Sequence, residues 1–347
     1  MVEAVTYAII VLGIVVFSLS VIIVLVRAVR RALRRHRAHL AEAPRLALLE
    51  FVADGGVEGA DALVALPQRQ WQAAEPGAIA LLGKVRGEAH TALADVFARR
   101  GLIEAELSDL THRSRVRRAR AAEALGNLEH RPAVYALCDL LRDRHSEVRL
   151  VAVRALGRIG DPIAAVPLLD SLATAGPTPS QLVAQALAQL GPKAEPALID
   201  ALGHREARVR VTALDALGLI GSGALIEPVA LVLEEDPSLD VRLAAANTLG
   251  RMGGRSAVPP LVVALGVDHP DRLRAAAARA LGEAGAAGVA EALAGLLVDP
   301  AYRVAHEAAH ALRKAGPAGL TVLRAASPAS PHAEEALAAA GVGTHGG

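Results

Sequence analysis

Leucines recur through the sequence at intervals of 30 to 32 residues, and this period constrains the fold more than any other feature. The recurring leucines are Leu125, Leu156, Leu187, Leu217, Leu249, Leu281 and Leu312. Most of them end one shared pattern, in which Val-Arg or Leu-Arg is followed by small residues, Ala-Leu and Gly, as in residues 209–218. A fixed period in this range is the signature of stacked repeats, so the sequence predicts an all-α solenoid.

Each repeat has the sequence features of two helices joined by a turn that often contains Asp. The second helix carries the repeated pattern, and we expect the shorter, apolar first helices at residues 133–141, 165–172, 195–202, 226–233, 258–265 and 289–297. Hydrophobic residues make up 53% of the chain but aromatic residues only 2%, which favours closely packed helices over a sheet. One repeat departs from the pattern: Pro177, Pro179 and Ser180 replace its usual start, so we expect a loop or kink there.

The cysteine content and the charge exclude several classes of protein. Cys138 is the single cysteine, which excludes an internal disulfide framework and a cysteine-based zinc site. The net charge is +1, but residues 40–347 hold 31 basic and 35 acidic groups and are mildly acidic. Nucleic-acid binding needs a broad basic surface, so we expect no nucleic-acid partner.

An uncharged run of 22 residues, 5–26, stands near the N-terminus. As a helix it would span roughly 33 Å, about the thickness of a bilayer core, which predicts a retained transmembrane helix; a buried core helix is the alternative. Only Glu3 precedes the run, whereas six arginines follow it: Arg27, Arg30, Arg31, Arg34, Arg35 and Arg37. The positive-inside rule then places the N-terminus outside the inner or plasma membrane and the C-terminal body in the cytoplasm. These arginines would contact lipid headgroups or only fix the topology.

The predicted domain organisation follows from these features. It comprises an extracytoplasmic N-terminus (1–4), a transmembrane helix (5–26), a basic juxtamembrane helix and linker (27–44), degenerate N-terminal capping repeats (45–113), the main repeats (114–326), and a C-terminal cap with a flexible tail (327–347). Residues 85–93 carry the repeat pattern, so the array begins at least by residue 76. Solenoids need atypical end repeats to cover their last apolar face, and Trp71 is expected to serve this purpose.

The repeated residues resemble HEAT-like repeats of the phycobilisome-lyase type, over roughly residues 76–326. The resemblance implies a right-handed α-solenoid of helical hairpins, in which the second helices line the concave side. It also implies that the recurrent arginines pair with an Asp or a backbone carbonyl in an adjacent turn, with ligand binding as the alternative. These arginines are Arg86, Arg149, Arg210, Arg242 and Arg274. The family includes adaptors, scaffolds and a few enzymes, so the resemblance specifies fold more closely than function.

A polar residue stands at the sixth position after the Val position in the clear repeats. These residues are Glu123, Arg154, Gln185, Asp215, Asn247, Arg279 and His310. Leu150, Val211 and Leu243 lie four residues earlier on the same helix face. We therefore expect a partner-binding groove with a polar row beside a partly apolar row; coverage of these side chains by neighbouring helices is the alternative.

His306, Glu307 and His310 form an H-E-x-x-H string, which on a helix can bind zinc with the Glu as base. A third ligand is needed, and Glu334 and Glu335 are at a plausible distance in the sequence. However, Val304 and Leu312 also place the string in the ordinary repeat register.

The string also looks like the His-Glu pairs of deoxyhypusine hydroxylase, a HEAT-repeat di-iron enzyme. The equivalent pairs here, such as Leu150-Val151, lack ligands, and one pair cannot hold two irons. We therefore predict no bound metal, no cofactor and no catalytic residue.

Together these features predict a membrane-anchored cytoplasmic scaffold or adaptor. Its concave groove would bind a protein partner, itself in or at the membrane, and the anchor would raise the local concentration of that partner. The alternative is a metal-dependent enzyme, hydroxylase-like or lyase-like, that uses His306, Glu307 and His310.

Overall fold

The computed structural model describes Val24, Arg27, residues 46–49, Phe51, and residues 59–174, 178–285 and 288–341. These residues form helices and turns, and none of them lies in a β-strand. The chain divides into two compact units, Met1–Ala105 and Glu106–Gly347. The predicted all-α fold is therefore confirmed for the described part of the chain, while the finer domain boundaries remain predictions.

The predicted membrane localisation is corrected. Among the helices that the structure describes, none combines the length and the apolar surface needed to cross a bilayer. A single-pass protein with its N-terminus outside and its body in the cytoplasm is thus not supported, because that prediction rested on the hydropathy of one run. Apart from Val24 and Arg27, which are exposed, the proposed span and the arginines assigned to lipid headgroups lie outside the described residues.

The first unit contains α2 (Gly59–Ala65), α3 (Gln68–Leu82) and α4 (Glu88–Arg99); α5 (Leu102–Asp109) leads into the second unit. Trp71 is 2% exposed and packs edge-on against Phe97, with the ring centroids 5.2 Å apart. The guanidinium of Arg100 lies 4.5 Å from the Trp71 ring and donates to the carbonyl oxygens of Leu63, Val64 and Leu66. Trp71 therefore belongs to the core of this unit.

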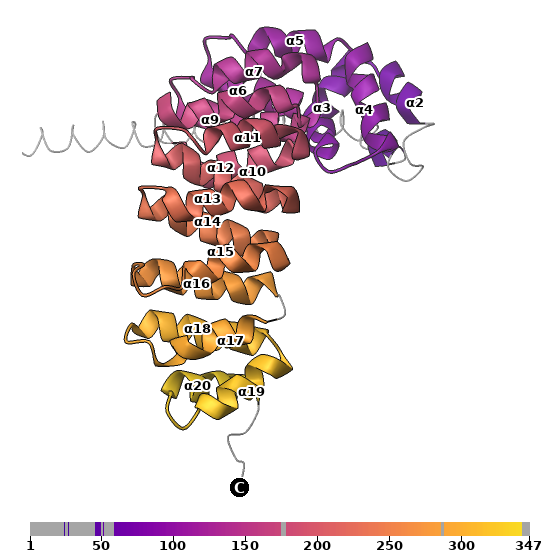
Figure 1. Ribbon diagram of the computed structural model, residues 1–347. Coiled ribbons are helices and arrows are strands. Elements are labelled where there is room, and N and C mark those ends of the chain that lie inside the picture. The colour runs from indigo at the N-terminus through magenta and orange to yellow at the C-terminus, as the bar shows by residue number, and fades with distance from the viewer. Residues whose placement is uncertain are drawn as a thin grey trace, which may run out of the picture. The chain divides into compact units, whose positions relative to one another are not determined.

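The second unit is a row of helical hairpins (Figure 1). It opens with α6 (Arg115–Asn127), which packs against α8 (Ser146–Ile159) and counts as the first of the second helices. The first helices of the following repeats are α7 (Val134–Leu140), α9 (Ala165–Thr174), α11 (Glu195–Ala201), α13 (Ile226–Glu235), α15 (Val258–Val263) and α17 (Val289–Ala294). The second helices are α8 (Ser146–Ile159), α10 (Ser180–Gln189), α12 (Ala207–Ile220), α14 (Leu239–Met252), α16 (Asp271–Ala284) and α18 (Tyr302–Lys314), and the hairpin α19 (Pro317–Ala326) and α20 (Pro331–Ala339) ends the row.

Single turns of 3-10 helix adjoin the first helices. They are η1 (Arg131–Ala133), η2 (Pro162–Ala164), η3 (Pro192–Ala194), η4 (Gly223–Leu225), η5 (Arg255–Ala257) and η6 (Gly295–Val298). Several second helices end at a glycine in the left-handed conformation, such as Gly160 with φ 68° and Gly221 with φ 76°. Glycine adopts this conformation without the steric cost that a Cβ imposes. The glycines of the repeated pattern, such as Gly157 and Gly218, lie three residues earlier and inside these helices, so the expectation that they end the helices was wrong.

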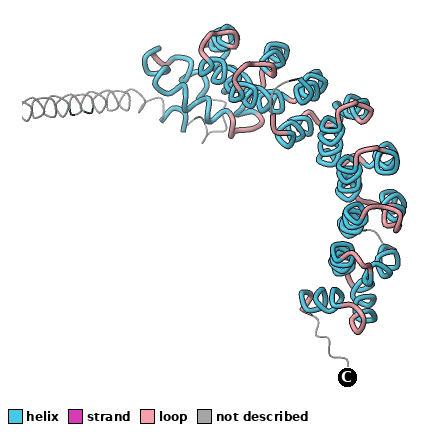
Figure 2. Tube along the Cα trace, turned by 90° about the vertical axis from the view of Figure 1, so that its left-hand side faces the viewer, coloured by secondary structure: helices cyan, strands magenta, loops and turns pink. Residues whose placement is uncertain are grey.

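The second helices pack closely on one another through small residues. A Cβ added to Gly250 would lie 2.8 Å from the Cα of Ala280, and one added to Gly282 would lie 2.8 Å from the Cα of Ala311. The first helices contact each other much less extensively. Figure 2 shows the repeats of this unit following an arc. Because the more closely spaced row of a curved stack lies on its inner side, the second helices line the concave side.

The irregular repeat that the sequence predicted is present at α10. This helix has 10 residues, whereas α8 and α12 have 14 each. Its N-cap is Pro179, with φ −61° and ψ 120°, so the chain enters the helix from an extended conformation. Proline favours such an entry because its ring fixes φ and it has no N–H to donate. The second-helix row is therefore continuous but shorter at this point.

Candidate functional site

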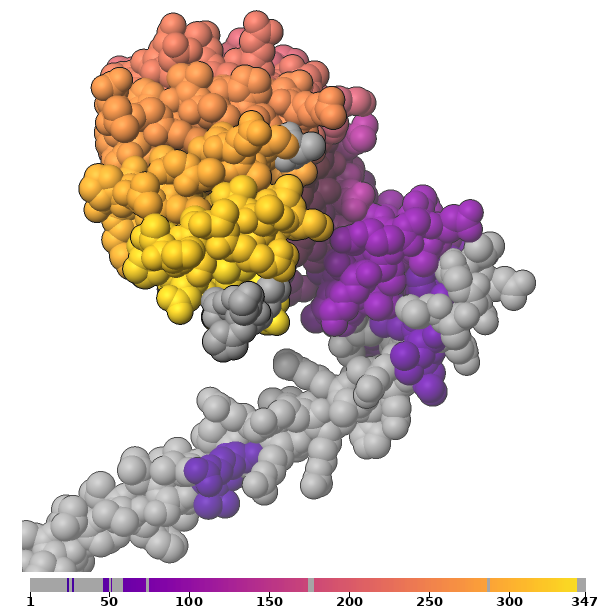
Figure 3. Space-filling model, turned by 60° about the horizontal axis from the view of Figure 1, so that its bottom comes forward, coloured from indigo at the N-terminus to yellow at the C-terminus, as the bar shows by residue number. Residues whose placement is uncertain are grey.

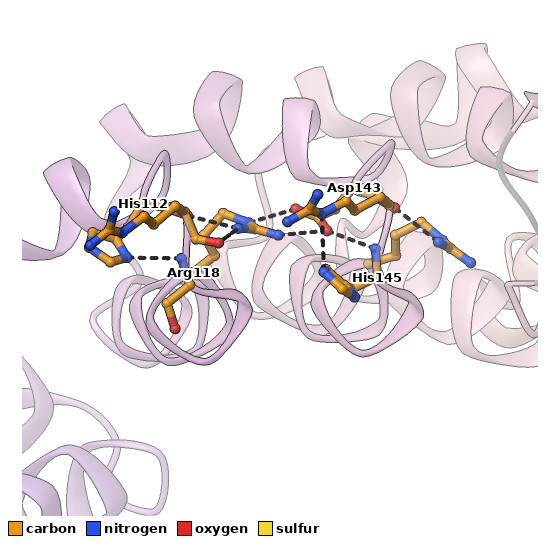
Figure 4. Close-up of polar contacts among 8 residues, drawn as sticks. His112, Arg118, Asp143 and His145 are labelled. Atoms are coloured by element: carbon orange, nitrogen blue, oxygen red, sulfur yellow. Dashed lines mark hydrogen bonds and ion pairs between the residues drawn. The ribbon is translucent and has the colours of Figure 1, made fainter.

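Three arginines of the second helices bury their guanidinium groups in the turn that precedes the next second helix. Each binds an aspartate there: Arg118 with Asp143 at 2.7 Å, Arg210 with Asp236 at 2.7 Å, and Arg274 with Asp299. Figure 4 shows the first pair. The side chains are at most 10% exposed. We call these pairs the arginine ladder.

Each ladder aspartate also fixes the start of the following helix. Oδ1 of Asp143 accepts the backbone N–H of His145 at 2.8 Å, and Asp236 accepts that of Ser238 at 2.8 Å. Burial by itself would raise the pKa of Asp143, but the hydrogen bonds from Arg118 and from the His145 N–H, together with the charge of Arg118, outweigh it and lower the pKa. The carboxylate is therefore charged and fully engaged within the protein.

The predicted pairing of the recurrent arginines holds for four of the five. Besides Arg210 and Arg274, Arg149 donates to the carbonyl of Asp143 at 2.9 Å, and Arg242 donates to the carbonyl of Leu233 at 2.9 Å. Arg86 differs, because it lies exposed in the turn before α4 and donates only to the carbonyl of its neighbour Val85.

Sequence reasoning missed Arg118, the first member of the ladder. In its repeat, Arg117 occupies the place where the other repeats have Val or Leu, so the Val-Arg pattern does not identify it. Counting back seven residues from Leu125, as from Leu156 to Arg149, would have found it.

In α10 the recurrent arginine is absent, and an arginine of the next repeat bonds to this region instead. Ser180 stands where the neighbouring repeats have Arg149 and Arg210, by the same count from Leu187. Arg208, on α12, donates to Oγ of Ser180 at 2.9 Å and to the carbonyl of Thr178. A guanidinium from the following repeat thus bonds to the turn and first residue of α10.

The residues predicted to line the groove all lie on one face of the second helices, which we call the second-helix face. Glu123, Arg154, Gln185 and Arg279 are exposed, and Asp215, Asn247 and His310 are half-buried. The apolar members Leu150, Val211 and Leu243 are half-buried as well. Neighbouring helices therefore leave both rows accessible to a partner.

Side chains at the C-terminal half of this face are linked across neighbouring helices. Arg251 bonds to Asp215 at 3.1 Å, and Arg279 bonds to Asn247 at 3.0 Å and to Glu307 at 3.5 Å. By contrast, the side chains of Glu123, Arg154 and Gln185 make no hydrogen bond or ion pair with any residue that the structure describes. The N-terminal half of the face therefore offers polar groups with no partner inside the chain.

The histidines of the H-E-x-x-H string lie on α18 with their ring centroids 4.5 Å apart. Burial and the neighbouring His306 lower the pKa of His310. The Glu of the string does not join them, since it pairs with Arg279. Instead, His332 and Glu335 of α20 approach His306, with one ligand atom from each of the three residues within 4.8 Å of the others. Sequence reasoning named Glu335 but missed His332, whose spacing of three residues from Glu335 places both on one helix face.

A cavity of about 300 Å³ lies between α13 and α15, away from the second-helix face. Leu231 and Val263 line its apolar part and are 55% and 63% exposed, while Glu234, Arg242 and His269 supply polar groups. The sequence did not predict this cavity, because it forms between first helices of successive repeats and depends on the separation of those helices.

Comparisons with known proteins agree with this architecture. The family model described as HEAT repeats matches residues 103–188 and 226–313, which together make up half of the chain. No curated protein sequence matches this chain. Among solved structures, that of the CpcE and CpcF complex of phycocyanin lyase from Nostoc sp. PCC7120 is 26% identical, with 68% of this chain and 92% of that chain covered and a TM-score of 0.32.

Two further structures share the helical-repeat likeness at lower identity. Kap121p bound to Pho4p is 16% identical, with a TM-score of 0.48, and the match covers 81% of this chain and 39% of that chain. Human deoxyhypusine hydroxylase in complex with glycerol is 20% identical, with a TM-score of 0.30, and the match covers 82% and 94%. With the family model matched over half of its length, this chain belongs to the HEAT-repeat proteins.

Proposed function

We propose that this HEAT-repeat chain is a protein-binding scaffold and that the second-helix face binds the partner. One observation carries the proposal: Glu123, Arg154 and Gln185 present unpartnered polar groups on successive second helices, beside the accessible Leu150. Solenoids of this kind use their extended concave surface for binding, and the second helices line that surface here.

The chemistry of the face indicates what the partner presents. Neighbouring packed helices lie about 8–10 Å apart, so successive side chains are spaced to contact successive parts of an extended or helical protein segment. On the partner, a cationic group would pair with Glu123, a carboxylate with Arg154, and an apolar side chain would pack against Leu150. A protein segment of mixed charge meets all three requirements.

A scaffold is favoured over catalysis by the position of Glu307. H-E-x-x-H chemistry needs this carboxylate as a base beside the metal-bound water. Glu307 instead extends toward Arg279 on α16, with Oε1 3.5 Å from the guanidinium nitrogen. Because the carboxylate pairs with this guanidinium, it is not placed to serve as that base, which argues against the reaction.

Charge reversal at Arg154 tests the proposal. Arg154→Glu should weaken binding of the partner at least about tenfold, or 1.4 kcal/mol, because a carboxylate on the partner would face another carboxylate. The measurement is affinity purification with the full chain, followed by titration of the protein that co-purifies. Asp215 is less suitable for this test, because its reversal would also break the ion pair with Arg251.

The matched control is Lys193→Glu, which makes the same charge change at an exposed residue of η3, outside the second-helix face. Both variants should unfold at the wild-type temperature. Equal binding by Arg154→Glu and wild type, or equal loss in the two variants, would show that the second-helix face is not the binding site.

A further inference from the structure

Three metal-ligating side chains from two helices converge near the C-terminal end of the second unit, the yellow region of Figure 3. His306 lies on α18, and His332 and Glu335 lie three residues apart on α20. Nδ1 of His306 is 3.9 Å from Oε2 of Glu335. His306 takes the position on α18 that Leu150 and Leu243 take on their helices, so the group lies at the C-terminal end of the second-helix face, but the scaffold function proposed above does not use it.

The separation of these atoms fits a bridging ion better than a hydrogen bond. A nitrogen–oxygen hydrogen bond needs about 2.7–3.2 Å, so the two groups do not bond directly. Ligand atoms around tetrahedral Zn²⁺ lie about 3.3 Å apart, because each metal–ligand bond is about 2.0–2.1 Å long. The three ligand atoms lie within 4.8 Å of one another, so they must close by up to about 1.5 Å on binding, and the Glu335 side chain, 60% exposed, is free to rotate for this.

An aromatic side chain holds the two imidazole rings in place. Tyr302 stacks on His306 with centroids 5.6 Å apart and an interplanar angle of 14°, and it meets His332 edge-on with centroids 4.7 Å apart. The start of α20 is fixed as well, because the buried Ser330 donates its hydroxyl to the carbonyl of Leu297 at 2.8 Å. The ligand-bearing helices thus keep the rings together before any ion binds, which lowers the entropic cost of binding.

We propose that His306, His332 and Glu335 bind one Zn²⁺ ion, which joins α20 to α18. Two imidazole nitrogens and one carboxylate oxygen are a donor set that zinc uses, with a water molecule in the fourth position. Both histidines are half-buried and Glu335 is exposed, so an ion and its water can enter from solvent. This ligand set differs from the H-E-x-x-H set, because His310 and Glu307 are not ligands.

The test is calorimetric titration of the untagged full chain with Zn²⁺, together with the visible spectrum of the Co²⁺-substituted protein. We expect one equivalent to bind, a tetrahedral Co²⁺ spectrum, and a rise in Tm with zinc concentration. His332→Ala and Glu335→Ala should each lower the affinity by at least about tenfold, since even removal of a residue that only supports a ligand costs that much. His310→Ala is the matched control and should keep the wild-type affinity.

Several results would overturn the proposal. One is the absence of stoichiometric binding; another is wild-type affinity in His332→Ala. A loss in His310→Ala as large as that in His332→Ala would show that the two histidines of α18 hold the ion instead. Circular dichroism and thermal unfolding in the presence of chelator check that the variants fold, and they should match wild type because the substituted side chains are partly or fully exposed.

Discussion

At the scale of single residues, the arginine ladder makes the strongest prediction. Asp236→Ala leaves the Arg210 guanidinium buried without its counter-ion, and loss of one partner of a buried ion pair costs about 3–5 kcal/mol. Arg210 also donates to the carbonyls of His204 and Arg205, which do not replace the lost charge. Urea unfolding, followed by circular dichroism, measures the change in the free energy of unfolding.

Asp240→Ala is the matched control for this prediction. Asp240 lies 3.6 Å from Arg272, but the two side chains are 76% and 54% exposed. Exposed pairs contribute about 0–1 kcal/mol because water and salt screen them. Similar destabilisation in the two variants would mean that burial does not distinguish the ladder from a surface ion pair.

At the scale of helices, the glycines of the second helices set how closely these helices approach. A Cβ on Gly250 would lie 2.8 Å from the Cα and 2.9 Å from the Cβ of Ala280, so the backbones must move apart. Overpacking of this kind costs about 1–3 kcal/mol, although alanine by itself is the better helix former. We expect Gly250→Ala to lower the free energy of unfolding.

Gly77 gives the opposite expectation within a helix of the first unit. A Cβ at Gly77, in α3, would meet no atom within 4 Å, so Gly77→Ala should gain about 0.5–1 kcal/mol from helix propensity alone. Thermal unfolding of Gly77→Ala, Gly250→Ala and wild type measures the change in stability that each substitution causes. If Gly250→Ala were also stabilising, the approach of α14 and α16 would not depend on glycine.

How well the sequence predicts a structural feature depends on whether the residues that form it recur within each repeat. The leucine period and the Val-Arg pattern identified the second helices and four of the five arginines, because those features recur within each repeat. His332 and the cavity between α13 and α15 were missed, because each depends on contacts between helices of different repeats. Arg86 was misassigned because α4 begins only at Glu88, so the pattern there falls in a turn.

At the scale of the whole molecule, the ladder predicts how stability varies with pH. The pKa of Asp143 is lowered in the folded protein, so its contribution is fully present above the pKa of the unfolded chain, about 3.9. It is lost as the pH falls through the lower folded value, because protonation then removes the charge that Arg118 holds. We expect Tm to fall steeply below about pH 4 and little between pH 5 and pH 7.

Asp143→Asn tests the assignment of this pH dependence. The variant should be less stable than wild type at pH 7, and the difference should shrink as the pH falls, because the wild-type carboxyl becomes neutral as well. Differential scanning calorimetry at a series of pH values measures both curves. A difference in stability that stays constant with pH would contradict the role given to this carboxylate.

The order of the ladder partners along the chain gives the array a direction. Each arginine is neutralised by an aspartate that belongs to the next repeat, so a chain cut after Ala284 would keep Arg274 and lose Asp299. Two second helices, α10 and α18, lack this arginine and carry Ser180 and Ala305 at its position, and Ser330 rather than an aspartate caps α20. A repeat with a ladder arginine therefore depends on the repeat after it for the counter-ion of a buried charge, and a shortened array is best ended after a second helix that lacks this arginine, such as α18.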